Sequence, residues 1–338
     1  MPNTELETQT PTKLALITQR AGEDSRCRFT SLAHLLDAGF LKGCYLELGR
    51  DRASGIDGVT WKEYGENLDE NLRDLVARMK AKRYKPQPAK RVYIPKDEHA
   101  MRPLGLPALE DKIVQKGIAR ILEAIYEADF LDCSYGFRPG RSCHQALNAV
   151  DKTIMTRPVN HVIDADIKGC FDNVSHEWLM KFLGLRVSDP SFLLLIRRFL
   201  KAGYVDARQF VATERGTPQG GNLSPILSNV FLHYALDLWF ERRVKARTPG
   251  RCHLVRYADD VLCLVQNKED AERIRRELQE RLAKFDLELH PGKTVVISFG
   301  RYERENAKRQ GRKAHTFDFL GFTHFCGQSR RGKFIVGR

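Results

Sequence analysis

Apolar residues recur every three or four positions along several stretches of the chain, a spacing that predicts helices with one buried face. The clearest stretch follows Pro107, where one stripe carries Ile113, Gly117, Ile118, Ile121, Leu122 and Ile125. Ser224 followed by Pro225 predicts another helix start, since Ser caps free N–H groups and Pro fits the first turn. Asn267 with Asp270 predicts a capped start in the same way. Further helices are predicted at 62–82, 142–153 and 189–201.

Alternating apolar and polar residues predict strands between these helices. Such runs occupy 85–96, 161–167, 294–299 and 317–325, and 253–265 contains two runs joined by a tight turn. In the C-terminal half the predicted order is a strand, two helices, a strand hairpin, a helix and two strands. That order favours an α+β fold, with one sheet backed by helices, over a regular parallel sheet. The polar residues 1–30 are predicted to form a flexible N-terminus.

Composition narrows the class of protein and of partner. The chain has 338 residues, with 56 Lys and Arg against 43 Asp and Glu, so its formal net charge is +13. Its length predicts two or three lobes, and its ordinary hydrophobic share of 42% excludes a disordered or fibrous chain. An excess of Lys and Arg attracts polyanions, so nucleic acid or an anionic surface is the expected partner. Solubility alone also accounts for a positive charge.

Cysteine spacing and hydropathy exclude other classes. The eight cysteines are scattered with no CxxC pair, which argues against a zinc ribbon or a disulfide framework. No run of about 18 apolar residues is present, and Met1 to Thr12 lacks the apolar core of a secretory signal. We therefore expect no membrane partner, and a location in a bacterial-type cytoplasm or an organellar matrix.

The positive charge is concentrated near the C-terminus. Between Ile297 and Arg338 there are ten basic and three acidic residues. The stretch 301–313 lies between two predicted strands and is expected to be an exposed basic loop. It is either a solvated face or a loop that grips phosphates, and the charge run alone does not separate the two.

Two sets of carboxylates carry the strongest chemical signal. Asp259 and Asp260 are adjacent at the tip of the predicted hairpin, where a plain turn signal is the competing interpretation. In VIDADI, Asp164 and Asp166 share one strand face, and an Asp within an apolar strand is costly unless it is paired or binds a cation. Carboxylates without His or Cys partners suit Mg²⁺, and two such ions would clamp a phosphoryl displacement. The pattern predicts nucleotidyl transfer.

Motifs around these carboxylates resemble one family. YADD (257–260) and DADIKGCFD (164–172) resemble the two catalytic strands of reverse transcriptases. The surrounding motifs, in the family's order, are RASGIDGVT (52–60), RVYIPKDEHAMRPLGLP (91–107), SYGFRPGRSCHQAL (134–147), RGTPQGGNLSPILSN (215–229), LHPGKT (289–294) and FDFLGF (317–322). Together they resemble a group II intron-encoded reverse transcriptase/maturase, or a bacterial group II-like relative.

The resemblance implies the fingers and palm of a right-hand polymerase, with an antiparallel palm sheet backed by helices. It implies an N-terminal extension and fingers over 31–160, and a palm over 161–338 with a helical finger-side insertion at about 185–215. The relatives commonly continue into a helical thumb, which we expect to be absent from this chain because it stops just after the palm. No His/Cys cluster of an HNH nuclease is seen.

Catalytic roles follow from the resemblance, position by position. Asp166, Asp259 and Asp260 resemble the metal-binding triad, and Ile167 resembles a position that binds metal through its backbone carbonyl. The implied cofactor is a pair of Mg²⁺ ions, for which Mn²⁺ can substitute. Phe171 resembles the steric gate that rejects a ribonucleotide 2′-OH, and core packing is its alternative role.

The remaining roles concern nucleotide and nucleic acid. Lys96 and Arg102 resemble residues that grip the incoming triphosphate, Gln219 one near its sugar and base, and Lys293 one near its phosphates that acts as a general acid. The implied template contacts are Arg138 and Arg141, for which salt bridges are the alternative, and residues 49–60. The implied primer grip is Phe319, Leu320, Gly321 and Phe322, for which core packing is the alternative.

The expected function is therefore an RNA-directed DNA polymerase that extends a DNA primer on an RNA template with dNTPs, with a further role for structured intron RNA. The main alternative is a catalytically idle, maturase-like RNA-binding protein or a truncated copy. A palm polymerase that makes RNA from RNA is a third hypothesis, against which Phe171 and the YADD tip argue.

Overall fold

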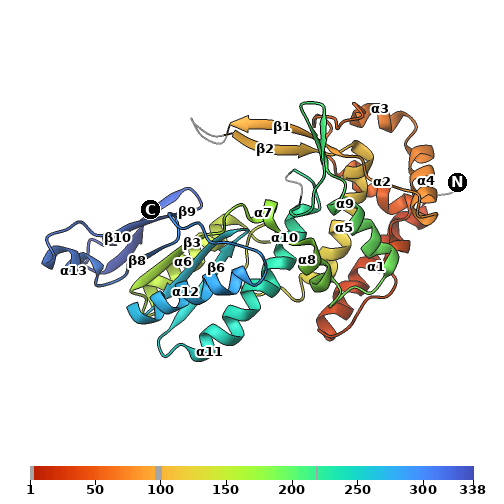
Figure 1. Cartoon of the computed structure of the whole chain (residues 1–338). Helices are drawn as coiled ribbons and strands as arrows, with labels where there is room; N and C mark the ends of the chain where they lie inside the picture. Colours follow the sequence, from red (N-terminus) through yellow and green to blue (C-terminus); the bar gives the residue numbers. More distant parts are fainter. Residues whose placement is uncertain (1–3, 96–100, 218–219) are drawn as a thin grey trace. The chain divides into compact units, whose positions relative to one another are not determined.

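The computed structural model describes residues 4–95, 101–217 and 220–338, and it combines helices with three β-sheets in an α+β fold (Figure 1). The chain divides into two compact units. The first contains residues 1–129 and 171–230, and the second contains residues 130–170 and 231–338. In the part of the chain that the structure describes, every helix is too short or too polar to cross a membrane.

The first unit is built around the apolar helix predicted after Pro107, which is confirmed as α5 (Leu109–Tyr126). Its predicted stripe is buried, with Ile113, Ile118, Ile121 and Leu122 all 0% exposed. The other helices are α1 (Thr4–Glu23), η1 (Ala33–Leu35), α2 (Ala38–Leu46), α3 (Trp61–Glu66), α4 (Leu68–Lys80), α7 (Cys170–Asn173), α8 (His176–Leu183), α9 (Pro190–Leu200) and α10 (Ser224–Leu232). Helices α7 and α10 each cross a boundary between the units.

The sheet of the first unit has the strand order β2-β1-β4-β5. Its strands are β1 (Ala89–Pro95), β2 (Met101–Leu106), β4 (Tyr204–Asp206) and β5 (Gln209–Val211). Strands β1 and β4 pair in parallel, while β1–β2 and β4–β5 are antiparallel hairpins. The segment after α9 is therefore joined to the β1–β2 hairpin through backbone hydrogen bonds.

Two predictions in the first unit differ from the structure. The helix predicted at 62–82 is two helices, α3 and α4, which are separated at Asn67 by a non-helical backbone (φ −123°, ψ 39°). The N-terminus expected to be flexible contains α1, whose Ala21 is 1% exposed. Arg186, itself buried, donates to the carbonyls of Ala21 and Asp24 and so provides partners for the C-terminal end of α1.

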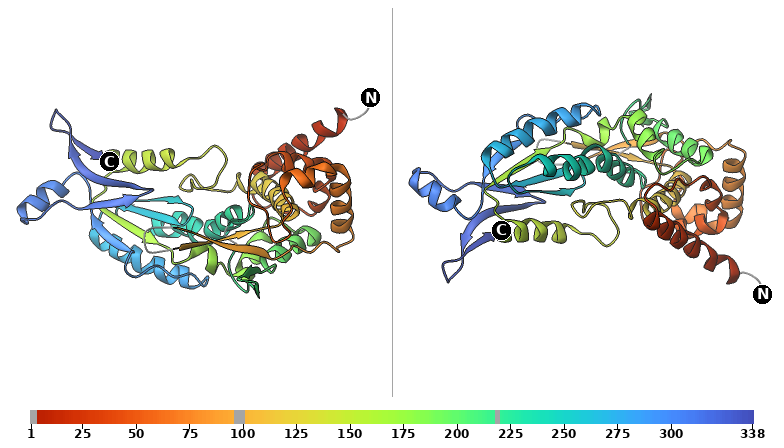
Figure 2. Two further views of the ribbon diagram at one scale, coloured as in Figure 1. Left: turned by 90° about the horizontal axis from the view of Figure 1, so that it is seen from above. Right: turned by 90° about the horizontal axis from the view of Figure 1, so that it is seen from below.

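The second unit contains a fully antiparallel sheet of order β6-β7-β3-β8. Its strands are β3 (His161–Asp166), β6 (Cys252–Tyr257), β7 (Asp260–Val265) and β8 (Val295–Ser298). The helices of this unit are α6 (Cys143–Thr156), α11 (Lys245–Arg247), α12 (Lys268–Ala283) and α13 (Glu303–Arg309), with two π-helices, η2 (His233–Asp237) and η3 (Phe240–Val244). Helices α6 and α12 cover opposite faces of the sheet (Figure 2).

A second sheet, of order β11-β10-β9, packs with α6 into one core. Its strands are β9 (Thr316–Phe319), β10 (Phe322–Gln328) and β11 (Phe334–Gly337). The single strand predicted at 317–325 is thus a hairpin, because Leu320 and Gly321 both have positive φ (52° and 81°) and reverse the chain. The basic loop expected at 301–313 contains α13.

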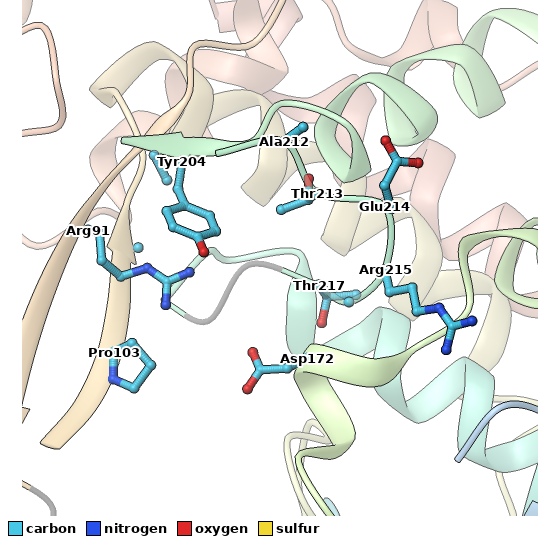
Figure 3. Close-up of a pocket in the computed structure, with 12 residues that line it drawn as sticks. Arg91, Pro103, Asp172, Tyr204, Ala212, Thr213, Glu214, Arg215 and Thr217 are labelled. Carbon is cyan, nitrogen blue, oxygen red and sulfur yellow. The ribbon is translucent and has the colours of Figure 1, made fainter. Parts of the chain in front are cut away.

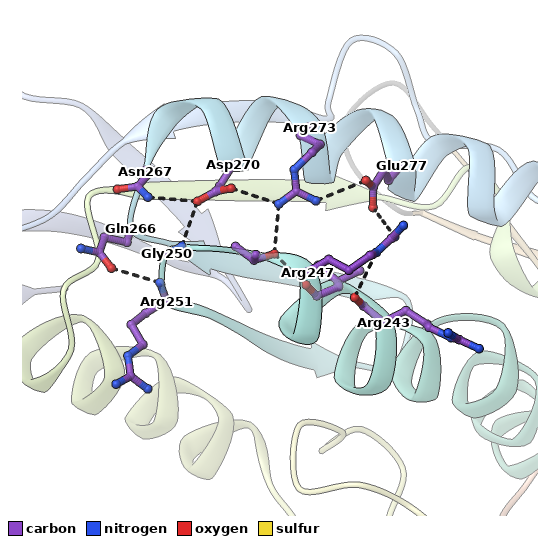
Figure 4. A network of polar contacts seen from close by, with 11 residues as sticks. Arg243, Arg247, Gly250, Arg251, Gln266, Asn267, Asp270, Arg273 and Glu277 are labelled. Atoms are coloured by element: carbon purple, nitrogen blue, oxygen red, sulfur yellow. Dashed lines mark hydrogen bonds and ion pairs between the residues drawn. The ribbon is translucent and has the colours of Figure 1, made fainter.

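The start of α12 is stabilised differently from the predicted cap. Asn267 stands at the N-cap, but its amide donates to the Asp270 carboxylate at 3.0 Å instead of capping the helix backbone. The same carboxylate accepts the backbone N–H of Gly250 (Figure 4). Arg273 extends the network by bridging Asp270 and Glu277.

Candidate active site

The register of the central strands brings the predicted carboxylates to one end of the second unit's sheet. Asp166 on β3 lies directly opposite Asp260 on β7. Paired residues of an antiparallel sheet point to the same face, and Asp164 joins them there because it precedes Asp166 by two positions. Asp259 stands next to Asp260 in the turn between β6 and β7. Strand β3, strand β7 and the turn between β6 and β7 therefore place four carboxylates at neighbouring positions.

The turn that carries Asp259 is a two-residue hairpin with unfavourable backbone geometry. Tyr257 pairs with Asp260, which leaves Ala258 and Asp259 as the central residues. Ala258 has φ +54°, a region where Gly is the usual residue of such turns. An alanine there costs about 1–2 kcal/mol, so neighbouring groups must stabilise the turn.

One such neighbour is Gly136 of the GFRPGRS segment. A Cβ added at Gly136 would come within 3.0 Å of the Tyr257 carbonyl carbon and 3.1 Å of the Ala258 Cα, and closer still to the Ala258 nitrogen. Only a glycine permits this approach, because the atoms it meets are backbone atoms with no rotamer to change.

Burial, and then like charges, disfavour ionisation of the carboxyl groups at this end of the sheet. Partial burial, and then the carboxylates of Asp259 and Asp166, raise the pKa of Asp260 to about 6. Burial, followed by Asp260, Asp166 and Asp318, likewise raises the pKa of Asp164 to about 6. Asp164 and Asp318 were not among the predicted site residues. The position of Asp164 on the Asp166 face was the available signal, whereas nothing local pointed to Asp318.

The LHPGKT segment is attached to the end of β3. The His290 N–H donates to the Asp166 carbonyl at 2.8 Å, and Ile167, 1% exposed, forms a bridge with Leu289. The Lys293 ammonium lies 3.4 Å from the Asp166 carboxylate. The structure therefore brings the predicted Lys293 to the predicted catalytic strand.

The carboxylates at this end of the sheet are the candidate ligands of a divalent cation. Among the described residues, no three or more His, Cys, Asp or Glu side chains are arranged as a group that could hold a metal ion. The donors that are present are carboxylate oxygens, and the raised pKa values of Asp164 and Asp260 reflect burial first and then neighbouring negative charge, which a cation would neutralise. Mg²⁺ needs few carboxylates because substrate phosphates and water complete its shell. The donor chemistry fits Mg²⁺ that binds together with a phosphate substrate.

The predicted nucleotide-binding residues belong mainly to the first unit. Phe171 on α7 is half-buried, and its carbonyl accepts the N–H of Thr217 at 2.7 Å. Arg102 is exposed on β2, opposite Ile94 of β1. Lys96 and Gln219 lie outside the described residues.

The first unit also contains a cavity of about 270 Å³ (Figure 3). Arg91 on β1 and Asp172 on α7 line it, and the Arg91 guanidinium lies 3.7 Å from the centre of the Tyr204 ring. Arg91 and Asp172 were not among the predicted site residues. Their places in the motifs RVYIPKDEHAMRPLGLP and DADIKGCFD were the available signal.

The predicted template contacts make bonds within their own segment. Arg138 is only 8% exposed and donates to the carbonyls of Leu131 and Ser134 at 2.9 and 2.8 Å. Arg141 forms an ion pair with Asp132 at 2.6 Å. The structure thus contains the salt bridge that was the alternative role for Arg141.

The predicted primer grip divides into a buried and an exposed part. Phe319 is 5% exposed within the core shared with α6, as its alternative role required. Phe322 is 44% exposed and pairs with Phe319 across the turn. The exposed residues of FDFLGF are therefore Asp318, Gly321 and Phe322.

Comparison with known proteins adds independent information to this geometry. A family model described as reverse transcriptase (RNA-dependent DNA polymerase) matches residues 94–324, which is more than half of the chain and includes every candidate carboxylate. The chain is a member of the reverse transcriptase family. Within that family its relatives include group II intron-encoded proteins and intron maturases, so the resemblance seen in the motifs is confirmed.

Two bacterial relatives illustrate the similarity. The chain is 39% identical over 207 residues to the group II intron-encoded protein LtrA of Lactococcus lactis, a match that covers 61% of this chain and 34% of LtrA. It is 37% identical over 273 residues to the protein YkfC of Escherichia coli, covering 72% of this chain and 71% of YkfC. The chain thus spans about a third of the length of LtrA.

A solved structure supports the fold. Telomerase from Candida albicans, solved with a fragment of telomeric RNA, is similar with a TM-score of 0.53 at 16% identity, over 78% of this chain and 48% of the telomerase chain. At this identity the similarity concerns the fold alone, and it agrees with the α+β architecture of a polymerase.

Proposed function

We propose that this reverse transcriptase family member is an active RNA-directed DNA polymerase that extends a DNA primer on an RNA template. The observation that carries the proposal is the β3–β7 register, which sets Asp166 opposite Asp260 and next to Asp259. Asp166, Asp259 and the Ile167 carbonyl would hold two Mg²⁺ ions, and Asp260 would complete the carboxylate set. The ions, for which Mn²⁺ can substitute, supply Lewis-acid stabilisation of the phosphate charge when bound.

The other residues bind the nucleotide and move a proton. Lys293 lies beside Asp166 and is the group that donates a proton to the departing pyrophosphate. Arg102, together with Lys96, binds the triphosphate of the incoming nucleotide. Phe171 excludes a ribose 2′-OH, and Gln219 contacts the sugar and base. These assignments follow from the family motifs and make dNTPs the substrates.

We assign residues 31–160 to an N-terminal extension and fingers, and 161–338 to a palm. The parallel pairing of β4 with β1 supports a finger-side role for the segment at 185–215, because that segment leads into the β1–β2 sheet. The antiparallel sheet that carries the carboxylates, backed by α6 and α12, supports the palm assignment.

The charges on and around helix α13 support the proposal that RNA or the primer–template is the partner. Of its two acidic residues, Glu303 is 4% exposed and bonded to Arg312 and His315, so this negative charge is turned inward and neutralised, whereas Glu305 is exposed. The basic residues around it are exposed: Arg301, Arg304, Lys308, Arg309 and Lys313. A cluster of exposed cations with few competing acids binds phosphates and releases counterions. Of the two interpretations of the basic stretch, we favour the phosphate-gripping one.

Primer extension tests the proposal. The protein is incubated with a DNA primer on an RNA template, dNTPs and Mg²⁺, and Asp259→Ala is expected to abolish extension while leaving RNA binding unchanged. Glu280→Ala, which removes an exposed carboxylate of α12, is the matched control and should extend like the wild type. A folded, RNA-binding wild type that is inert with both Mg²⁺ and Mn²⁺ would refute the polymerase and favour an idle, maturase-like protein.

Nucleotide competition tests the choice of product. We expect dNTPs to be incorporated strongly over rNTPs, and Phe171→Ala to reduce that preference. Equal use of both by the wild type would contradict the steric-gate assignment and favour a polymerase that makes RNA.

A further inference from the structure

A fully buried ion pair lies behind the turn that carries Asp259. Arg256 and Asp237 are both 0% exposed, and the guanidinium donates to both carboxylate oxygens, from Nε at 2.8 Å and from Nη2 at 2.6 Å. Asp237 is the last residue of the π-helix η2, which lies nineteen residues before Arg256. Buried ion pairs of this kind often add nothing to stability compared with apolar residues of the same size. The presence of this buried ion pair therefore needs an explanation other than stability.

The remaining donors of Arg256 reach the turn and its support. Nη1 donates to the Ala258 carbonyl at 2.9 Å, and Nη2 also donates to the Ser134 hydroxyl at 2.8 Å. The Ala258 carbonyl belongs to the peptide bond that joins Ala258 to Asp259. The guanidinium thus binds, in one plane, a fixed carboxylate and the peptide next to the proposed metal ligand.

Arg256 approaches this peptide from the face opposite to the carboxylates. It is paired with Val261, whereas the neighbouring pair Tyr257–Asp260 points to the Asp166 face. The backbone of Arg256 is also fixed, because its N–H donates to Cys133 and its carbonyl accepts from Tyr135 at 2.7 and 2.8 Å. Gly136, the residue after Tyr135, packs directly against the backbone of Ala258. The turn is therefore supported from behind by one guanidinium and one short backbone segment.

We propose that Arg256, held by Asp237 and Ser134, is a positioning residue that sets the Asp259 turn in its strained conformation for catalysis. The inference rests on the proposed polymerase function. It assigns a role to a residue that touches neither metal nor substrate, and it explains why a costly buried pair occupies this place. Without the Nη1 hydrogen bond, the Ala258–Asp259 peptide is free to rotate away from its positive-φ geometry.

A double variant separates positioning from stability. Arg256→Met combined with Asp237→Leu removes both charges and keeps an apolar core, so it is expected to melt near the wild-type temperature. The hydrogen bond to the turn is lost. We expect kcat for primer extension to fall about 10²-fold, the usual cost of a misplacement of about 1 Å, with KM for dNTP unchanged within about twofold. Deuterium exchange of the backbone amides over 257–261 should be faster.

A second buried arginine provides the matched control. Arg186 is 2% exposed, pairs with Asp129 at 3.0 Å and also donates to backbone carbonyls, but in the first unit. Arg186→Met with Asp129→Leu should leave kcat and the exchange at 257–261 at wild-type values. If the Arg256 double variant fails to fold, Arg256→Lys replaces it, since one ammonium group lacks the fork that bonds Asp237 and Ala258 together.

The outcomes are distinct. A folded Arg256 variant with wild-type kcat and wild-type exchange overturns the inference, and so does an equal loss of kcat in the Arg186 control. A wild type that extends no primer defeats the proposed function instead, while the exchange measurement still decides whether Arg256 holds the turn. Faster exchange only in the Arg256 variant shows in either case that Arg256 holds the turn, and together with the loss of kcat it supports the inference.

Discussion

Gly136→Ala adds a single methyl group at the back of the YADD turn. The new Cβ would lie 3.0 Å from the Tyr257 carbonyl carbon and 3.1 Å from the Ala258 Cα, where carbon atoms normally stay about 3.5–4.0 Å apart. The Ala258 nitrogen would lie closer still, so the turn must move by about 1 Å. Overpacking of this kind costs about 1–3 kcal/mol, and a displacement of about 1 Å at a reacting group lowers the rate about 10²-fold. We expect kcat to fall between tenfold and a hundredfold.

The assay is single-turnover primer extension at saturating dNTP, with the melting temperature recorded for each variant. Gly140→Ala, four residues on, is the control: Gly140 has φ +69° and no atom within 4 Å of the added Cβ. Alanine at this position should lower the free energy of unfolding by about 1–2 kcal/mol through backbone strain, but its Cβ would displace no neighbouring atom. Both variants should therefore lose a few degrees of melting temperature, and only Gly136→Ala should lose its rate.

The reasoning is refuted in either of two ways. A folded Gly136→Ala protein with the wild-type rate would mean that the turn tolerates the displacement or that its position does not limit catalysis. An equal loss of rate in both variants would mean that general destabilisation of the segment, rather than contact with Ala258, is responsible.

Two further predictions concern stability and charge. Burial raises the pKa of Asp111, 2% exposed, to about 7, so between pH 4 and 7 the unfolded chain loses a proton that the folded chain keeps. This group should therefore lower the free energy of unfolding by up to about 4 kcal/mol over that range, and urea titrations should show that Asp111→Asn reduces the total fall by that amount, leaving the smaller share of carboxyls such as Asp164 and Asp260. Replacing Arg304, Lys308 and Arg309 by Gln should weaken RNA binding and reduce the slope of log K against log salt by up to about three, without a change in melting temperature. An unchanged salt slope would remove α13 from the RNA-binding surface.

Local patterns were sufficient wherever one periodicity controlled the structure. The apolar stripe of α5 and the alternation along β3 each reflect burial of one face, which residues a few positions apart can report. The hairpin at Asp259 was predicted for the same reason, and so was the order of elements that makes the fold α+β. The local signal was mixed elsewhere: the basic residues around α13 suggested a loop, and the polar N-terminus gave no sign of α1, where Ala21 is the buried residue among 13–23.

The candidate site shows the same division. The amino-acid sequence alone identified Asp166, Asp259 and Asp260, because carboxylates in apolar strands and in a hairpin tip are unusual, and because the motifs around them belong to one family. Tertiary structure alone brought Arg256 to Asp237 and, across 122 residues of sequence, to Ser134, and brought the bare Cα of Gly136 against the turn. These contacts depend on which buried donor faces which backbone atom. The spacing of residues along the chain does not encode such tertiary contacts. A carboxylate within an apolar strand, in contrast, is visible in the sequence from its residue type alone.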